Sequence, residues 1–88
     1  MKKEEIDTSY LIELMDAVIE DTSVPRNIRK VVEDSKHKIE NKKELSLGIS
    51  SAIYMLDDIS NDINMPSHSR TEIWTIISEL EKLKETTK

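Results

Sequence analysis

Hydrophobic residues recur along the chain in four separate stretches, and within each stretch they stand three or four residues apart. This spacing places them on one face of an α-helix, whereas no stretch alternates apolar and polar residues as a half-buried strand does. We therefore predict an all-α protein with four helices. The apolar positions are Leu11, Leu14, Met15, Val18; Ile28, Val31, Val32, Ile39; Ile49, Ala52, Ile53, Leu56, Ile59; and Ile73, Ile76, Ile77, Leu80, Leu83.

The stretch D-T-S-V-P-R-N-I-R, from Asp21 to Arg29, returns 41 positions later as D-I-N-M-P-S-H-S-R, from Asp62 to Arg70. The same offset aligns apolar positions between the two halves, so the chain is an internal repeat. Proline in a first helical turn loses no hydrogen bond, and the residue before it favours an extended backbone. Each copy is therefore predicted to be the turn between two helices, with the second helix starting at the proline.

Each predicted turn residue has a structural role. Asp21 and Asp62 can accept hydrogen bonds from backbone N–H groups of the turn, which is typical of aspartate in this position. One helical turn beyond the proline, Arg29 and Arg70 can reach back toward an aspartate or a carbonyl. We expect these positions to brace the turns rather than to bind a ligand. The structural set is Asp21, Pro25, Arg29, Asp62, Pro66 and Arg70.

A helix pair with an aspartate in its turn, a proline, an arginine and a period near 40 resembles the HEAT family of α-solenoid repeats. The predicted organisation is one domain over residues 1–88, with a first unit at about 6–41, a linker at 42–46 and a second unit at about 47–85. We expect two HEAT-like hairpins packed in one compact bundle. Two units are fewer than a free solenoid usually needs, so a four-helix bundle and assembly through an open end are alternatives.

The two proline motifs also carry a second resemblance, which covers nearly the whole chain. D-T-S-V-P-R-N-I-R together with L-D-D-I-S-N-D-I-N-M-P-S-H-S-R-T-E-I-W is similar to the signature of an uncharacterised family of short, all-helical archaeal proteins. The resemblance implies an archaeal source and a helical fold. It implies no activity and carries over no catalytic residue.

Composition narrows the chemistry that the chain can perform. It has 88 residues, of which 36% are hydrophobic and 35% are charged, and it has no cysteine. Disulfides and thiolate metal sites are therefore excluded, and the interior of a cell is the expected compartment. The longest uncharged run, Leu45 to Leu56, is about half of what spans a bilayer and contains serines. We expect a cytoplasmic protein that does not enter membranes.

Charge is distributed unevenly around the net value of -5. Residues 24–43 carry seven Lys and Arg against three acids, whereas both ends of the chain are acidic. A basic helix of this kind can contact phosphates, so an accessory nucleic-acid or ribonucleoprotein binder is one hypothesis. No aromatic residue stands between these cations to stack on bases, and a solvated helix face is the simpler interpretation. The candidate phosphate contacts are Arg26, Lys30, Lys36, Lys42 and Lys43.

Each candidate catalytic or metal-binding residue lacks the partner residues that such a site needs. Asp34, His37 and Glu40 would share a helix face, but no second histidine stands near them. Asp57 and its neighbour point about 100° apart on a helix and cannot share a proton or a substrate. His68 lacks a visible nucleophile or orienting group. We expect no catalytic residue, no metal, no cofactor and no enzyme.

Two aromatic residues break the symmetry of the repeat. Tyr54 aligns with Glu13, and Trp74 aligns with Glu33. Either these aromatics are covered within the protein, by N-terminal residues around Ile6 and Tyr10, or they form an exposed face that another chain covers. The leading hypothesis is a non-catalytic protein-interaction or assembly module that self-associates or binds a protein through Tyr54 and Trp74.

Overall fold

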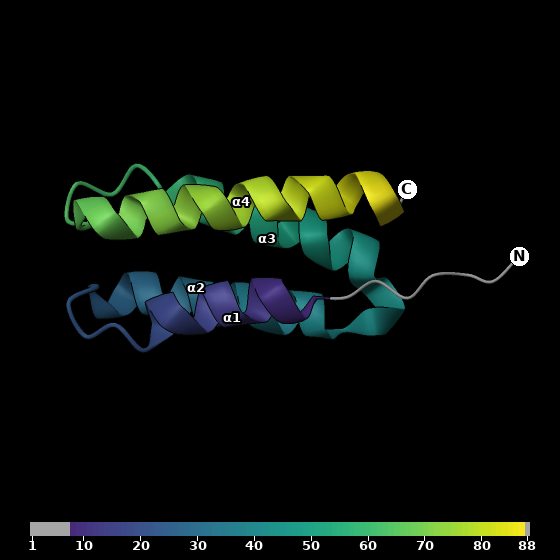
Figure 1. Ribbon diagram of the computed structural model, residues 1–88, viewed down its shortest axis with the longest axis horizontal. Coiled ribbons are helices and arrows are strands. Elements are labelled where there is room, and N and C mark those ends of the chain that lie inside the picture. Colours follow the sequence, from purple (N-terminus) through teal and green to yellow (C-terminus); the bar gives the residue numbers. More distant parts are fainter. Residues whose placement is uncertain (1–7, 88) are drawn as a thin grey trace, which may run out of the picture.

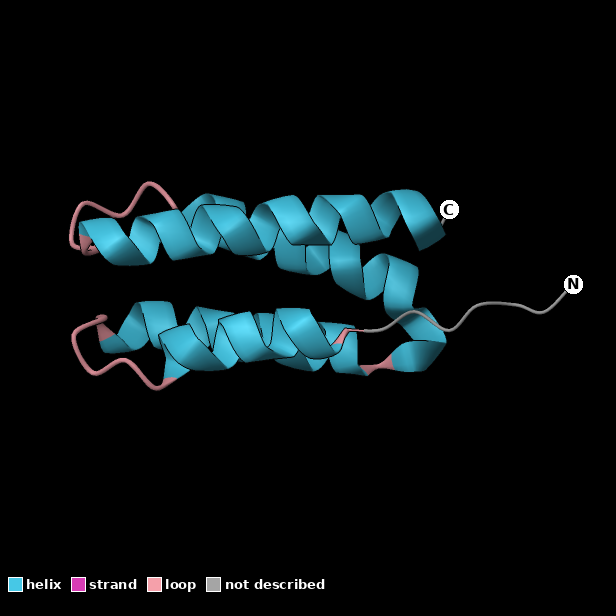
Figure 2. Cartoon of the chain, in the orientation of Figure 1, coloured by secondary structure: helices cyan, strands magenta, loops and turns pink. Residues whose placement is uncertain are grey.

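The computed structural model describes residues 8–87, and within that range it holds four α-helices and one short 3-10 helix. Helix α1 spans Ser9–Ile19, α2 spans Arg26–Glu40, α3 spans Leu45–Ile59 and α4 spans Ser67–Thr87. The 3-10 helix η1, Lys42–Glu44, joins α2 to α3. Figure 2 shows helices and loops throughout this range and no strand. The predicted all-α class is therefore confirmed.

The four helices form two antiparallel hairpins that pack side by side (Figure 1). Helix α1 packs on α2, α2 on α3, α3 on α4, and α4 returns to α1. This closed ring of contacts is a compact four-helix bundle. Both intra-hairpin turns lie at one end of the bundle, while the connection between α2 and α3 lies at the other. This arrangement does not by itself establish a HEAT-like stacking of the two hairpins, which stays a prediction.

The core lies between the helices and is formed by their predicted apolar faces. Met15, Ile28, Ile49 and Ile73 come from the four different helices, and each is fully buried. Several other members of the predicted stripes, including Ile53, are only partly buried and pack around the margin of this core. Burial of such side chains contributes about 1.5 to 3 kcal/mol each, which is the main stabilising term of so small a domain.

The two turns between paired helices share the same two hydrogen bonds to their aspartate. In the first turn the Val24 N–H donates to the Asp21 carbonyl at 3.0 Å, and the Ser23 N–H donates to the Asp21 carboxylate at 2.9 Å. In the second turn the Met65 N–H donates to the Asp62 carbonyl at 3.2 Å, and the Asn64 N–H donates to the Asp62 carboxylate at 2.8 Å. Each aspartate thus holds its turn with both its backbone and its side chain.

Both prolines stand directly before the first residue of a helix, since α2 begins at Arg26 and α4 at Ser67. The Pro25 carbonyl accepts from the Arg29 N–H at 3.1 Å, and the Pro66 carbonyl accepts from the Arg70 N–H at 3.0 Å. The arginine side chains also return to their own turns. Arg29 Nε donates to the Val24 carbonyl at 3.0 Å, and Arg70 Nη2 donates to the Asp62 carbonyl at 2.9 Å.

A glycine sets the distance between α2 and α3. Gly48 is buried in α3, and a methyl group built on its Cα would overlap the backbone carbonyl of Lys38 in α2. The two helices approach this closely because glycine presents no side chain at the crossing. Helix α3 begins at Leu45, so the last two residues of the predicted linker belong to the helix.

Candidate functional site

The two largest aromatic side chains of the repeat are exposed. Tyr54 in α3 is 77% exposed and Trp74 in α4 is 60% exposed. Residues 8–87, including Tyr10, therefore do not bury them, while Ile6 lies outside the described residues. Covering of Tyr54 and Trp74 by residues around Ile6 thus stays a prediction, as does covering by another chain.

Trp74 does not line the groove that α4 forms with α1. Of the α4 residues that do, Glu79 stands about 140° and Lys82 about 80° around the helix from Trp74, because each residue adds about 100°. Tyr54 stands directly opposite the buried stripe of its own helix, two residues from both Ala52 and Leu56. We call the exposed sides of α3 and α4 that carry Tyr54 and Trp74 the aromatic face.

Tyr54 and Trp74 each lie in an uncharged run, and the exposed Asp57 and Asp58 follow Tyr54 by one helical turn. The run Leu45 to Leu56 of α3 and the run Ile73 to Ser78 of α4 contain no charged residue, although 35% of the whole chain is charged. On α4 the exposed neighbours of Trp74 are Thr71, Thr75 and Ser78, which carry small hydroxyl-bearing side chains. A surface of this composition loses little hydration energy when another surface covers it.

The basic stretch of α2 pairs partly with acids of its own domain. Lys36 Nζ lies 2.7 Å from Asp16 Oδ1 of α1, and Lys30 Nζ lies 3.1 Å from Asp34. In each pair the hydrogen bond from the ammonium to the carboxylate raises the pKa of the lysine. Among the other predicted phosphate contacts, Arg26 and Lys43 are exposed, and the side chain of Lys42 lies outside the described residues.

The histidine and carboxylates on α2 do not converge on one point. His37 Nδ1 lies 3.2 Å from Glu40 Oε1, whereas Asp34 is engaged by Lys30. His37 also lines an open groove between α2 and α3, together with Leu47 and Met55. The groove mixes polar and apolar side chains.

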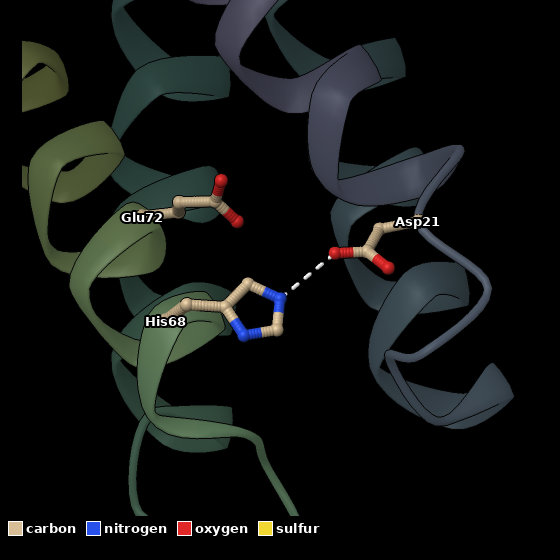
Figure 3. A group of neighbouring side chains, drawn as sticks. All are labelled: Asp21, His68 and Glu72. Carbon is tan, nitrogen blue, oxygen red and sulfur yellow. Dashed lines mark hydrogen bonds and ion pairs between the residues drawn. The ribbon is translucent and has the colours of Figure 1, made fainter.

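A different histidine meets two carboxylates at the turn end of the bundle. His68 Nε2, in the first turn of α4, lies 2.9 Å from Asp21 Oδ2 in the turn between α1 and α2. Glu72, one helical turn after His68, presents its carboxylate to the same space (Figure 3). One ligand atom from each of the three residues lies within 4.8 Å of the others. We call Asp21, His68 and Glu72 the turn-end cluster.

The environment of Asp21 stabilises its charged form. Hydrogen bonds from the Ser23 hydroxyl at 2.6 Å, from His68 and from the Ser23 N–H lower the pKa of Asp21 from 3.8 to about 2. Asp21 therefore presents an ionised carboxylate to His68 throughout the neutral range.

Known proteins with the same sequence pattern come from archaea. The model of an uncharacterised protein family, UPF0147, matches residues 1–83. The chain belongs to UPF0147. A UPF0147 protein of Thermoplasma volcanium is 49% identical over 71 residues, which cover 80% of each chain. Another, of Methanocaldococcus jannaschii, is 49% identical over 72 residues, covering 81% of this chain and 77% of that protein.

Solved structures show the same arrangement of helices. The crystal structure of a UPF0147 protein from Thermoplasma acidophilum superposes with a TM-score of 0.80 at 43% sequence identity, covering 84% of this chain and 88% of that one. A second crystal structure, of a protein of unknown function, also gives a TM-score of 0.80, at 40% identity over 90% of this chain and 96% of the other. The resemblance to an uncharacterised archaeal helical family is thus confirmed.

The sequence interpretation of this UPF0147 chain missed the turn-end cluster. It assigned Asp21 to a turn and His68 to an exposed first-turn position, and it did not consider Glu72. The available signal was the repeat itself, because His68 and Glu72 align with Asn27 and Val31, which have different chemistry.

Across residues 8–87, no helix has the length and apolar character that a bilayer span requires.

Proposed function

We propose that this UPF0147 chain is a non-catalytic interaction module that self-associates through the aromatic face, with a second copy of the chain as the occupant. The observation that carries the proposal is the exposure of Trp74, the only tryptophan of the chain, within a run of α4 that has no charged residue. Tryptophan and tyrosine are enriched in protein interfaces, where they anchor binding by filling pockets on the partner.

The aromatic residues support an interface because none of them contributes to the core. The chain contains one tryptophan, two tyrosines and no phenylalanine, and all three aromatic side chains are exposed. An aromatic side chain buries about 150 to 250 Å² when it is covered, so leaving all three in water forgoes much stabilisation of the monomer. Association recovers that stabilisation at the aromatic face.

The uncharged runs of α3 and α4 are compatible with a second copy as the occupant. Two copies with a net charge of -5 each repel one another if they meet through acidic surfaces. A contact through these runs places no charged residue of the runs themselves in the interface. A two-fold arrangement would place the same face on both copies, as in most homodimers.

Sedimentation velocity over a range of protein concentrations tests this proposal. Trp74→Glu places a charge at the centre of the face, and because Trp74 is exposed the helix should stay folded. We expect the wild type to sediment as a dimer at high concentration and the variant to stay monomeric with unchanged helical circular dichroism.

The matched control is Tyr10→Glu, which changes an exposed aromatic residue on α1 into the same acid. Its sedimentation should equal that of the wild type. The proposal is wrong if the wild type is monomeric at all concentrations, or if Trp74→Glu and Tyr10→Glu have equal effects.

Nucleic-acid binding through residues 26–43 stays a prediction with weaker support, because Lys30 and Lys36 are each paired with an aspartate. If RNA or DNA binds there, its affinity must fall steeply as salt rises from low to moderate concentration. An affinity that does not respond to salt would exclude a phosphate contact.

A further inference from the structure

We propose that Asp21, His68 and Glu72 form a binding site for a divalent transition-metal ion such as Zn²⁺. The site is distinct from the aromatic face. It joins the turn of the first hairpin to the first two turns of α4, so its ligands come from both halves of the repeat.

The residue types match the preference of such ions. An imidazole nitrogen and two carboxylate oxygens are a ligand set that suits Zn²⁺, Mn²⁺ or Fe²⁺. Ligands at about 2.1 Å from a tetrahedral ion lie roughly 3.4 Å apart. The three side chains offer ligand atoms within 4.8 Å of one another, and Asp21 Oδ2 and His68 Nε2 are already 2.9 Å apart. Changes of at most about 1.4 Å in the separations between these ligand atoms are enough to enclose an ion.

Glu72 supplies an independent indication of a missing partner. Its Oε1 atom is buried and has no hydrogen-bond partner in the part of the chain that the structure describes. A buried carboxylate oxygen without a partner is costly, and nearly all such atoms in native proteins are satisfied. A cation bound by either oxygen of the Glu72 carboxylate would offset part of this cost. His68 also contacts the Ser69 hydroxyl, 3.4 Å from Nε2, and this weak contact can be exchanged for a metal bond.

The second turn of the repeat provides an internal control. There Asn27 Nδ2 donates to Asp62 Oδ2 at 3.5 Å, and Asn27 and Asp62 are the repeat equivalents of His68 and Asp21. The contact between hairpins therefore requires only an amide. The equivalent of Glu72 is Val31, which offers no ligand. The contact between a turn and the facing helix therefore needs neither the imidazole of His68 nor the carboxylate of Glu72, both of which belong to the second unit.

The partly exposed position of His68 leaves one side of the cluster accessible to solvent. Three protein ligands and an open fourth position are typical of sites that exchange a water or a further ligand. Since the ligands come from two hairpins, a bound ion also ties the hairpins together. Any ion that binds only the folded state raises the temperature of unfolding.

Isothermal titration of the chelator-treated, full-length protein with ZnCl₂ tests the site, and a thermal melt gives a second readout. We expect one Zn²⁺ ion per chain and an unfolding midpoint that rises with Zn²⁺ concentration. The variant His68→Asn/Glu72→Val rebuilds the arrangement of Asn27 and Val31, so it should fold. It should bind Zn²⁺ at least tenfold more weakly and lose the thermal shift.

The matched control is His37→Asn, which removes the other histidine of the chain and should leave zinc binding unchanged. Glu72→Gln keeps the shape of the side chain and removes the charge, so it tests the site even if the double variant fails to fold. The proposal is overturned if the wild type shows no saturable one-to-one binding, if Glu72→Gln binds as tightly as the wild type, or if His37→Asn is the variant that loses binding.

Discussion

Asp21 and His68 are 47 positions apart in the chain, yet their side chains meet at 2.9 Å. In the equivalent pair the aspartate belongs to the second hairpin and its partner to the first: Asp62 Oδ2 accepts from Asn27 Nδ2 at 3.5 Å. Each aspartate sits in the turn of one hairpin and contacts the start of the second helix of the other hairpin. The two contacts therefore cross between the hairpins at the end of the bundle where both turns lie (Figure 1).

The crossing contacts explain why the turn motif occurs twice. Each aspartate uses one carboxylate oxygen to hold its own turn, as with the Ser23 N–H, and the other to reach the partner hairpin. The same side chain thus organises local structure and the packing of the two halves. In the second half, His68 adds a chemical group that the symmetric arrangement does not require.

Gly48→Ala should destabilise the protein by about 1 to 3 kcal/mol. Alanine is the better helix former by about 1 kcal/mol. The added methyl group, however, meets the backbone carbonyl of Lys38, which cannot rotate away as a side chain would. Helices α2 and α3 must therefore move apart. Urea denaturation followed by circular dichroism measures the change.

The control for this variant is Ser46→Ala, because Ser46 is an exposed residue of the same helix. Its effect should stay within about 0.5 kcal/mol of the wild type. A Gly48→Ala protein as stable as the wild type would show that α2 and α3 do not approach each other as closely as the structure indicates.

Ser23→Ala should raise the pKa of Asp21 from about 2 toward its ordinary value of 3.8, because the Ser23 hydroxyl makes the largest contribution to the lowering. The carboxyl chemical shift of Asp21, followed by NMR through an acid titration, measures this pKa directly. Thr22→Ala changes an exposed neighbour that makes no such contribution and should leave the pKa of Asp21 unchanged.

The lowered pKa of Asp21 also determines how the free energy of unfolding changes in acid. The folded-state pKa of Asp21 lies below its ordinary value of 3.8, so its ionised form favours folding. This contribution is complete above about pH 5 and is lost as the pH falls through the folded-state pKa of about 2. Ser23→Ala should therefore unfold with a weaker dependence on pH across that window. An equally steep dependence in both proteins would contradict the role given to the Ser23 hydroxyl.

Much of the fold could be predicted from the sequence, because it depends on local signals. Apolar spacing predicted four helices, and the structure contains four α-helices in its described range. Pro25 and Pro66 indicated where two of them begin, since proline constrains its own backbone and that of its predecessor. The predicted start of α3 was two residues late, because Leu45 and Ser46 offer no helix-start signal comparable to a proline.

Contacts between the halves could not be predicted in the same way. The meeting of Asp21, His68 and Glu72 depends on how one hairpin is oriented on the other, and that orientation is set by packing across the whole core. Sequence spacing reveals neighbours within one helix, as it did for His37 and Glu40, but not neighbours across a bundle. The exposure of Trp74 likewise depends on which flank of α4 is turned toward solvent.

The fluorescence of Trp74, followed as a function of protein concentration, is the most direct test of the aromatic face. Trp74 is the only tryptophan in the chain, so the emission reports on this one position. If two copies associate through the face, the emission should shift to the blue as concentration rises, because the indole leaves water. The shift should be absent in Tyr54→Glu if that residue belongs to the same interface. A wild-type emission that stays at the wavelength of a solvated indole at every concentration, while sedimentation shows no dimer, would contradict the account.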